Sequence, residues 1–219
     1  MRTITVKGIG NVSAKPDLVV ITMGLESLEK DYERAMQGAS KKIKELNESL
    51  ESVGFEKSSV KTTSFNVDAR YESQKNGAGN YTRVFKGFSC SQRLKIEFDL
   101  DMKLLALALN AIAGCVAKPE LSIRFQVKDP TAISEELLKS ATLNAKEKAK
   151  ILCEALGVQL GDLLSVDYNW GELRIFSRTE FMMAEKCMAL PTGASFDDMD
   201  FEPDDVDLSD TVTFVWEIK

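Results

Sequence analysis

Hydrophobic and polar residues alternate along several parts of the chain, and this period of two is typical of half-buried strands. In "DLVVITMGLES" every second residue is apolar, and the same alternation runs through "ELSIRFQVK". Near the end of the chain, "LLSVDYNW" and "DTVTFVWEIK" repeat it, with their apolar residues on even positions. These four stretches each predict a strand, and a further strand-like stretch, "TITVK", precedes the first of them.

The longest alternating stretches lie on either side of "QKNGAGN" and predict a hairpin. Before this turn, "SVKTTSFNVDARYES" alternates; after it, the alternation runs from Tyr81 to Phe98 and places six apolar residues on one face: Val84, Phe88, Cys90, Leu94, Ile96 and Phe98. Such a strand would be about 55 Å long at about 3.3 Å per residue. Because an isolated hairpin is marginal in water, we expect it to bend over its own sheet or to pack against another subunit.

Steps of three and four residues between apolar positions predict three helices. The first lies in "EKDYERAMQGASKKIKELNESLESVG" and ends at Gly54 as its C-terminal cap. The second, "DLDMKLLALALNAIAG", is apolar on almost every side, which indicates a buried helix with Asp99 or Asp101 as N-cap and Gly114 as its end.

The third predicted helix carries a stripe of small side chains. It begins at Asp129-Pro130, an N-cap followed by a first-turn proline, and ends at Gly157. Alanine recurs every four residues on one side of it, at positions Ala141, Ala145 and Ala149. We expect this stripe to let the helix lie close against a sheet.

The order of these elements predicts an α+β fold. We expect a mixed, mainly antiparallel sheet with about three helices packed on one face and a long protruding β-hairpin. The 219 residues are expected to form one domain over 1–219, with a mobile acidic, Met-containing insertion at about 178–208. Eight acidic residues lie between Asp197 and Asp210, but Pro203 stands where an EF-hand loop needs glycine, so the run predicts a solvated loop.

The segment "GIGNVSAKPD" raises the question of nucleotide binding. A dinucleotide fingerprint needs a third glycine and a following helix, whereas here Ser13 takes that position and a strand follows. We therefore interpret Gly8 and Gly10 as a bend between the first two strands, with Pro16 and Asp17 setting the start of the second.

Composition excludes several classes of function. The formal charge of −6 argues against nucleic-acid binding, and no apolar run approaches the length of a membrane span. The chain contains no histidine, which removes the usual general base, and it shows no motif for a cofactor or metal. "MRTITVKGIG" lacks the apolar stretch of a signal peptide, so we expect a cytoplasmic protein. Because no catalytic constellation is recognisable, we also expect that the protein is not an enzyme.

The four cysteines are spaced too widely for a local zinc or thioredoxin-type site. Cys90 and Cys153 fall on apolar faces and are expected in the core. Cys187 is the candidate redox thiol, because it stands beside Lys186 and a neighbouring cation lowers the pKa of a thiol. Glu135 and Glu136 are interpreted as first-turn acids of the third helix.

The chain resembles the SIMPL domain family. The resemblance is carried by "VKGIGNVSAKPD", by Ala35, by "VGFEKSSVKTTSFNV" and by "ATLNAKEKAKILCEALGVQLGDLLSV", with Ala145, Ala149 and Gly157 in the last of these. It implies an α+β domain, a tendency to form ring- or channel-like oligomers and no established catalytic residues. Bacterial members include periplasmic proteins linked to oxidative-stress defence, and a mammalian relative resembles a kinase-associated signalling adaptor.

These observations favour a non-enzymatic, self-assembling binding or scaffold protein, linked through its family to the stress response. The expected partners are further copies of the chain and a protein partner. The alternatives are a thiol-based redox protein that uses Cys187, a signalling adaptor, and recruitment of a basic partner or a divalent cation by the acidic run from Asp197 to Asp210.

Overall fold

The structure is a computed structural model that describes residues 2–75, 81–168, 176–183 and 202–219. The chain forms two compact units. Unit 1 comprises Met1–Asp17, Gln126–Arg178 and Pro203–Lys219, and unit 2 comprises Leu18–Phe125 and Thr179–Glu202. The predicted α+β class, the three helices and the antiparallel strands are confirmed, with the strands divided between two sheets.

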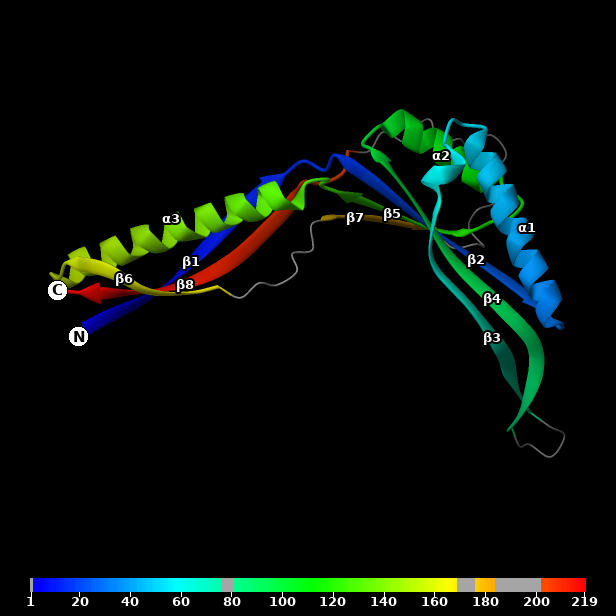
Figure 1. Ribbon diagram of the computed structural model, residues 1–219, viewed down its shortest axis with the longest axis horizontal. Coiled ribbons are helices and arrows are strands. Elements are labelled where there is room, and N and C mark those ends of the chain that lie inside the picture. The colour runs from blue at the N-terminus through cyan, green and yellow to red at the C-terminus, as the bar shows by residue number, and fades with distance from the viewer. Residues whose placement is uncertain (1, 76–80, 169–175, 184–201) are drawn as a thin grey trace. The chain divides into compact units, whose positions relative to one another are not determined.

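In unit 1, one helix covers one face of a three-stranded antiparallel sheet (Figure 1). The strand order is β1-β8-β6, in which β1 is Arg2–Ala14, β8 is Val206–Ile218 and β6 is Leu160–Asp167. The helix is α3, Pro130–Leu156. Strands β1 and β8 pair over their full length, from Arg2 opposite Ile218 to Ala14 opposite Val206.

Helix α3 packs against β1 at unusually short range because both surfaces lack bulk. Ala141, Ala145 and Ala149 are completely buried on the sheet side of the helix, as their spacing predicts. A Cβ atom at Gly8 would overlap the carbonyl oxygen of Ala141, and one at Gly10 would overlap that of Leu137. The predicted bend at Gly8 and Gly10 is therefore wrong: β1 continues through both residues, and the glycines make room for the helix.

The capping residues of α3 follow the sequence prediction, whereas Glu135 and Glu136 lie beyond its first turn, so their interpretation as first-turn acids is wrong. The Asp129 carboxylate accepts hydrogen bonds from the N–H groups of Thr131 and Ala132, and Gly157 ends the helix in the left-handed region at φ 68°. Asp17 fixes the segment that leads into this helix, since its N–H donates to the Gln126 carbonyl at 3.0 Å and its carboxylate accepts from Lys128 N–H at 2.8 Å.

In unit 2, two helices cover one face of a five-stranded sheet of order β3-β4-β2-β5-β7. The strands are β2 (Leu18–Glu29), β3 (Lys61–Lys75), β4 (Tyr81–Asp99), β5 (Glu120–Gln126) and β7 (Phe176–Met183). The helices are α1 (Tyr32–Glu51) and α2 (Met102–Gly114), and a short 3-10 turn, Lys57–Ser59, follows α1.

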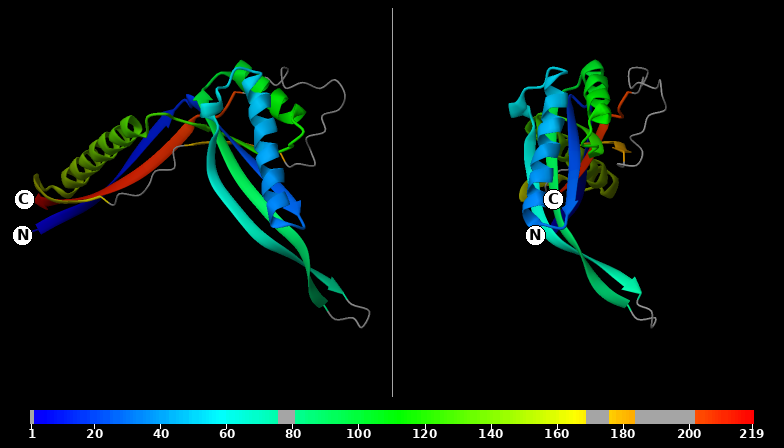
Figure 2. Two further views of the ribbon diagram at one scale, coloured as in Figure 1. Left: turned by 45° about the vertical axis from the view of Figure 1, so that its right-hand side comes forward. Right: turned by 90° about the vertical axis from the view of Figure 1, so that its right-hand side faces the viewer.

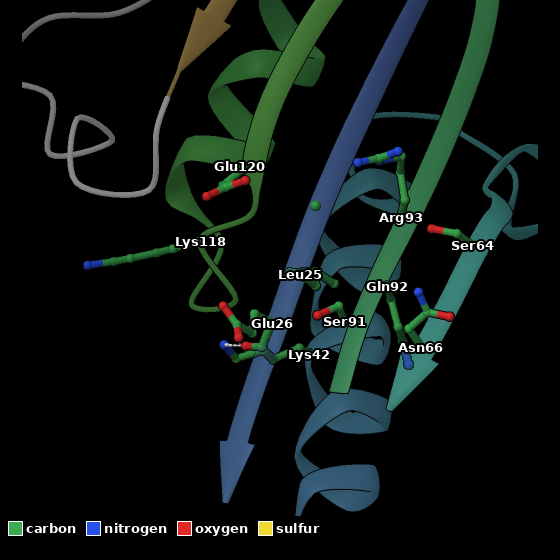
Figure 3. A pocket seen from close by; sticks show the side chains of 11 residues that line it. Leu25, Glu26, Lys42, Ser64, Asn66, Ser91, Gln92, Arg93, Lys118 and Glu120 are labelled. Atoms are coloured by element: carbon green, nitrogen blue, oxygen red, sulfur yellow. Dashed lines mark hydrogen bonds between the residues drawn. The ribbon is translucent and has the colours of Figure 1, made fainter. Parts of the chain in front are cut away.

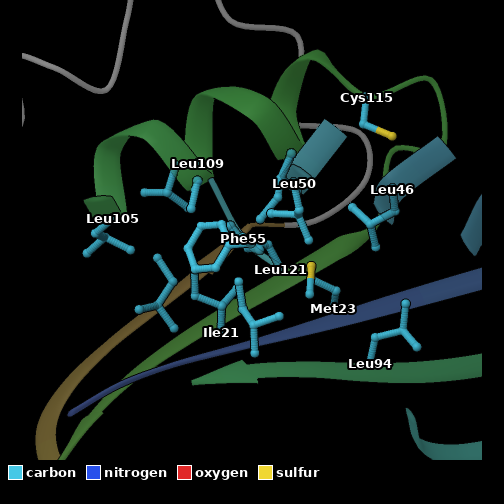
Figure 4. Packing of buried hydrophobic residues seen from close by; sticks show 14 of the residues in the cluster. Ile21, Met23, Leu46, Leu50, Phe55, Leu94, Leu105, Leu109, Cys115 and Leu121 are labelled. Atoms are coloured by element: carbon cyan, nitrogen blue, oxygen red, sulfur yellow. The ribbon is translucent and has the colours of Figure 1, made fainter. Parts of the chain in front are cut away.

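Large aliphatic and aromatic side chains fill the space between this sheet and its helices (Figure 4). Every second residue of β2 points into it, as the alternation predicts, and α1 contributes Leu46 and Leu50. The Asp101 carboxylate caps α2 by accepting from Lys103 N–H at 2.9 Å, and the chain turns after α1 at Gly54, which has φ 102°. Both helix ends agree with the sequence prediction.

The predicted hairpin is formed by β3 and β4 (Figure 2). Its alternation is interrupted by a bulge, because Arg70 pairs with Gly87 whereas Tyr71 pairs with Phe85. The bulge turns Phe85 to the face that carries Phe88, so the prediction that Val84 shares a face with Phe88 is wrong.

The predicted insertion at about 178–208 is described only at its two ends. Strand β7 covers its first residues, and β8 begins at Val206, inside the acidic run. Residues 184–201, which include Cys187 and the first acidic residues, lie outside the described residues.

Candidate functional site

The far part of the hairpin is a two-stranded arm, which we define as residues 70–75 and 81–87. Strand β2 ends at Glu29, opposite Phe88, so β4 has only β3 beside it from Gly87 to Tyr81. The arm exposes four large apolar side chains, with exposed fractions of 38–74%: Tyr71, Tyr81, Val84 and Phe85. Its strands thus carry an apolar surface that a two-stranded ribbon cannot bury by itself.

Aromatic rings connect this arm to the body of unit 2. Tyr71 lies edge-to-face with Phe85, and their ring centroids are 5.6 Å apart. The ring of Phe85 contacts that of Phe88 in the same way at a centroid distance of 5.4 Å, and Phe88 contacts Tyr32 of α1 at 5.7 Å. The Arg83 guanidinium lies 5.4 Å from the centre of the Tyr71 ring. This row of rings gives the base of the arm a defined conformation.

The arm is basic although the chain as a whole is acidic. It contains Arg70, Lys75, Arg83 and Lys86 against a single acid, Glu72. The Lys86 ammonium lies 2.5 Å from the Glu72 carboxylate, and this hydrogen-bonded ion pair lowers the pKa of Glu72. A basic arm on a chain of charge −6 is electrostatically suited to an acidic surface.

A second feature of unit 2 is a shallow polar pocket of about 420 Å³ on the sheet face opposite the helices (Figure 3). Its floor is set by strand register: Gly24 of β2 pairs with Arg93 of β4, which pairs with Ser64 of β3. The next matching row is Glu26, Ser91 and Asn66. Residues paired in this way share one face of a sheet, so the two rows stand side by side.

Two of the charged groups that line this pocket are already engaged. The Glu26 carboxylate accepts from the Ser89 hydroxyl at 2.5 Å and lies 3.8 Å from the Arg70 guanidinium. Lys42 of α1 donates to the Glu26 carbonyl at 2.5 Å. Three further charged groups line the pocket, on Arg93, Lys118 and Glu120.

The fold-signature residues predicted from sequence fall into separate places. Gly8, Gly10, Ala145 and Ala149 meet at the contact between β1 and α3, while Gly157 ends that helix. Pro16 and Asp17 lie between β1 and β2, and Gly54 follows α1. They build the fold and do not line the pocket; the pocket residues carry no sequence signal beyond a glycine inside the Val- and Ile-rich β2.

The three described cysteines are buried and unpaired with one another. Burial raises the pKa of the Cys90 thiol, which keeps it protonated near neutral pH. The predictions of core positions for Cys90 and Cys153 are confirmed. Cys187, the candidate redox thiol, lies outside the described residues, so its role stays a prediction.

Within the described ranges, no group of three or more Cys, Asp or Glu side chains is arranged to hold a metal ion. None of the helices that the structure describes is both long and apolar enough to cross a membrane.

These features define an α+β protein made of two helix-on-sheet units, one of which carries an exposed hairpin arm. The chain belongs to the SIMPL family, a family of unknown function also described as DUF541, whose model matches residues 4–216. The resemblance inferred from sequence motifs is thereby confirmed.

Two bacterial relatives have low sequence identity to this chain. The chain is 24% identical over 163 residues to the 26 kDa periplasmic immunogenic protein of Brucella melitensis, a match that covers 74% of this chain and 65% of that protein. It is 24% identical over 169 residues to the uncharacterized protein YggE of Edwardsiella ictaluri, covering 76% and 67% respectively. The match thus spans about two thirds of each relative's length.

Proposed function

We propose that this SIMPL protein is a non-enzymatic binding or scaffold protein that assembles with further copies of itself through the hairpin arm. The observation that carries the proposal is the arm itself, in which two strands without a third neighbour expose Tyr71, Tyr81 and Phe85. Association would bury these rings, and burial of a large apolar side chain is worth roughly 1.5–3 kcal/mol.

A comparison of one edge strand from each sheet, β1 and β3, supports this choice of surface. In unit 1, α3 covers the edge of β1: Asn144 accepts from Ile9 N–H at 3.0 Å, Ser140 from Asn11 N–H at 3.3 Å, and Lys148 donates to the Lys7 carbonyl. In unit 2, β3 is also an edge strand, and all but one of its residues are exposed. An open strand edge can accept a strand from another chain, whereas a covered edge cannot.

Multi-angle light scattering on the purified protein tests the proposal. The wild type is expected to show a mass of at least two chains of 24.3 kDa each. Replacing Tyr71 and Phe85 together by serine should shift the mass to that of the monomer, whereas the matched control Leu143→Ser, at an exposed position on α3 of unit 1, should leave it unchanged. A wild type that stays strictly monomeric at high concentration contradicts self-assembly; an assembly that survives in the arm variant contradicts the role of the arm.

The alternative function, thiol redox chemistry, rests on Cys187. Mild peroxide treatment followed by mass spectrometry should oxidise Cys187 selectively, since the other three thiols are buried. A protein with no selective oxidation at Cys187 is not a thiol sensor.

A cytoplasmic location and a link to the stress response stay proposals as well. The Brucella relative is named a periplasmic protein, so the location of this chain needs a direct test. Cell fractionation decides between the two compartments. A peroxide challenge of cells with and without the protein tests the stress link, and equal survival contradicts it.

A further inference from the structure

Gly24 stands out among the strand glycines that the structure describes. A Cβ atom at Gly8, Gly10 or Gly87 would overlap backbone atoms, and one at Gly161 would lie 3.0 Å from the Glu217 carbonyl oxygen, so packing explains all four. At Gly24 the same atom would meet nothing closer than 3.6 Å, an ordinary contact with Glu120. A glycine inside a strand often marks a place where a ligand approaches the backbone.

The empty space beside Gly24 belongs to the polar pocket, and charged groups of both signs surround it. Arg93 is the strand partner of Gly24. In Figure 3, Arg93 extends from β4 towards β2, and Glu120 of β5 lies on the other side of β2. Within the described part of the chain, the side-chain charges of Arg93, Lys118 and Glu120 have neither an ion-pair nor a hydrogen-bond partner. The hydroxyl groups of Ser64 and Ser91 line the same space.

Lys118 adds an independent observation. Its φ of 44° makes it the one non-glycine residue with positive φ in the described ranges. A non-glycine backbone in this sparsely populated conformation costs conformational energy, and such residues cluster at functional sites. The turn that holds Lys118 borders the pocket, while the Lys118 side chain extends away from β2 in Figure 3.

From this geometry we infer that the pocket over Gly24 binds a small amino acid or a compound of that class. The free cation of Arg93 matches the ligand's carboxylate, and guanidinium groups bind carboxylates through paired hydrogen bonds. The free carboxylate of Glu120 matches the ligand's ammonium group. The pocket's volume of about 420 Å³ suits a ligand of this size, and Gly24 leaves room for it against the sheet. This inference does not depend on self-assembly.

Aspartate and succinate are the matched probes, since they share two carboxylates and differ in the ammonium group. NMR titrations of the full-length protein should show saturable shifts of the Gly24, Ser91 and Arg93 amides with aspartate in the millimolar range, about 1 mM by the strength of a few exposed polar contacts. Succinate should bind more weakly. Glu120→Gln should remove this preference, and Arg93→Gln should weaken the binding of both probes at least tenfold.

Gly24→Val supplies the most decisive variant because it fills the pocket without removing a charge. Aspartate binding should fall at least tenfold, while the thermal midpoint stays the same or rises, since valine is favoured in strands. Gly24→Ala, whose added atom makes only ordinary contacts, serves as the milder version should valine disturb folding. Lys95→Gln, on the same sheet face but outside the pocket, is the control and should bind aspartate as the wild type does.

Three results would overturn the inference: no saturable shift with aspartate up to about 20 mM, a concentration that covers weak binding; equal affinity for aspartate in the Gly24→Val protein; or equal loss of affinity in Lys95→Gln, which would indicate general electrostatic attraction. Each of these outcomes can occur whether or not the protein assembles. The failure of the ligand site and the failure of self-assembly are therefore distinguishable.

Discussion

Both units bury helices against a sheet, but small residues form the contact in unit 1 and large side chains form it in unit 2. In unit 1, α3 presents alanines to the glycines of β1, and the backbones approach each other closely. In unit 2, α1 and α2 are separated from the sheet by a layer of large side chains such as Leu46, Leu50 and Phe125. Close approach depends on the absence of atoms, whereas a filled core depends on their presence, so the two contacts should respond differently to substitution.

The largest expected effect is at the glycine contact of unit 1. Gly8→Val adds atoms where the Ala141 carbonyl already lies, and α3 must move away, which should lower the free energy of unfolding by about 3 kcal/mol or more. Urea denaturation followed by the fluorescence of Trp216, in a Trp170→Phe background, reports on unit 1 because Trp216 lies in its core.

The matched control for this experiment is Gly24→Val in β2 of unit 2. The Cβ position there is free of collisions, so the free energy of unfolding should stay within about 0.5 kcal/mol of the wild type or rise. Far-UV circular dichroism is the readout for this variant, because Trp216 reports on unit 1. Equal losses for the two glycine variants would contradict the distinction between the contacts.

A smaller difference is expected at the helix starts. Asp129 of unit 1 accepts two backbone hydrogen bonds at the start of α3, whereas Asp31, at the start of α1, makes no side-chain cap bond. Asp129→Ala should therefore cost about 1 kcal/mol in urea denaturation and Asp31→Ala only a few tenths. A larger loss for Asp31→Ala would show that the caps are assigned to the wrong helices.

The smallest effect concerns pH and the arm of unit 2. The Lys86 ion pair holds the pKa of Glu72 below its ordinary value of 4.5. The contribution of this pair to arm stability is therefore present above pH 4.5 and is lost as the pH falls through the lowered pKa. An NMR titration of the Glu72 carboxyl carbon should give a midpoint below 4.5, and Lys86→Met should raise this midpoint towards the ordinary value. A wild-type midpoint at 4.5 would mean that the pair does not form in solution.

Features that depend on local periodicity could be predicted from the sequence. The alternation in β2, the alanine spacing in α3 and the cap residues Asp129 and Gly157 each act over a few neighbouring positions. Such signals are contained in a short window of sequence, and the structure confirms them.

Features that depend on distant residues could not be predicted. Gly8 was misinterpreted because the atoms that require a glycine there, in Ala141, lie 133 positions along the chain. The face of Val84 was misassigned because a one-residue bulge leaves no mark in the alternation of apolar residues. The pocket was missed because Gly24, Arg93 and Glu120 come from three strands, and only the strand pairing brings them together.

The central claim is that the arm of unit 2 forms the contact between subunits, while the β1 edge of unit 1, which α3 covers, does not. Hydrogen–deuterium exchange of the wild type over a range of protein concentrations tests it most directly. The amides of residues 71–75 should exchange more slowly as the concentration rises, and that of Ile9, already bonded to Asn144, should exchange at a constant rate. Exchange in the arm that is fast and independent of concentration, in a sample that light scattering shows to be assembled, would contradict the account.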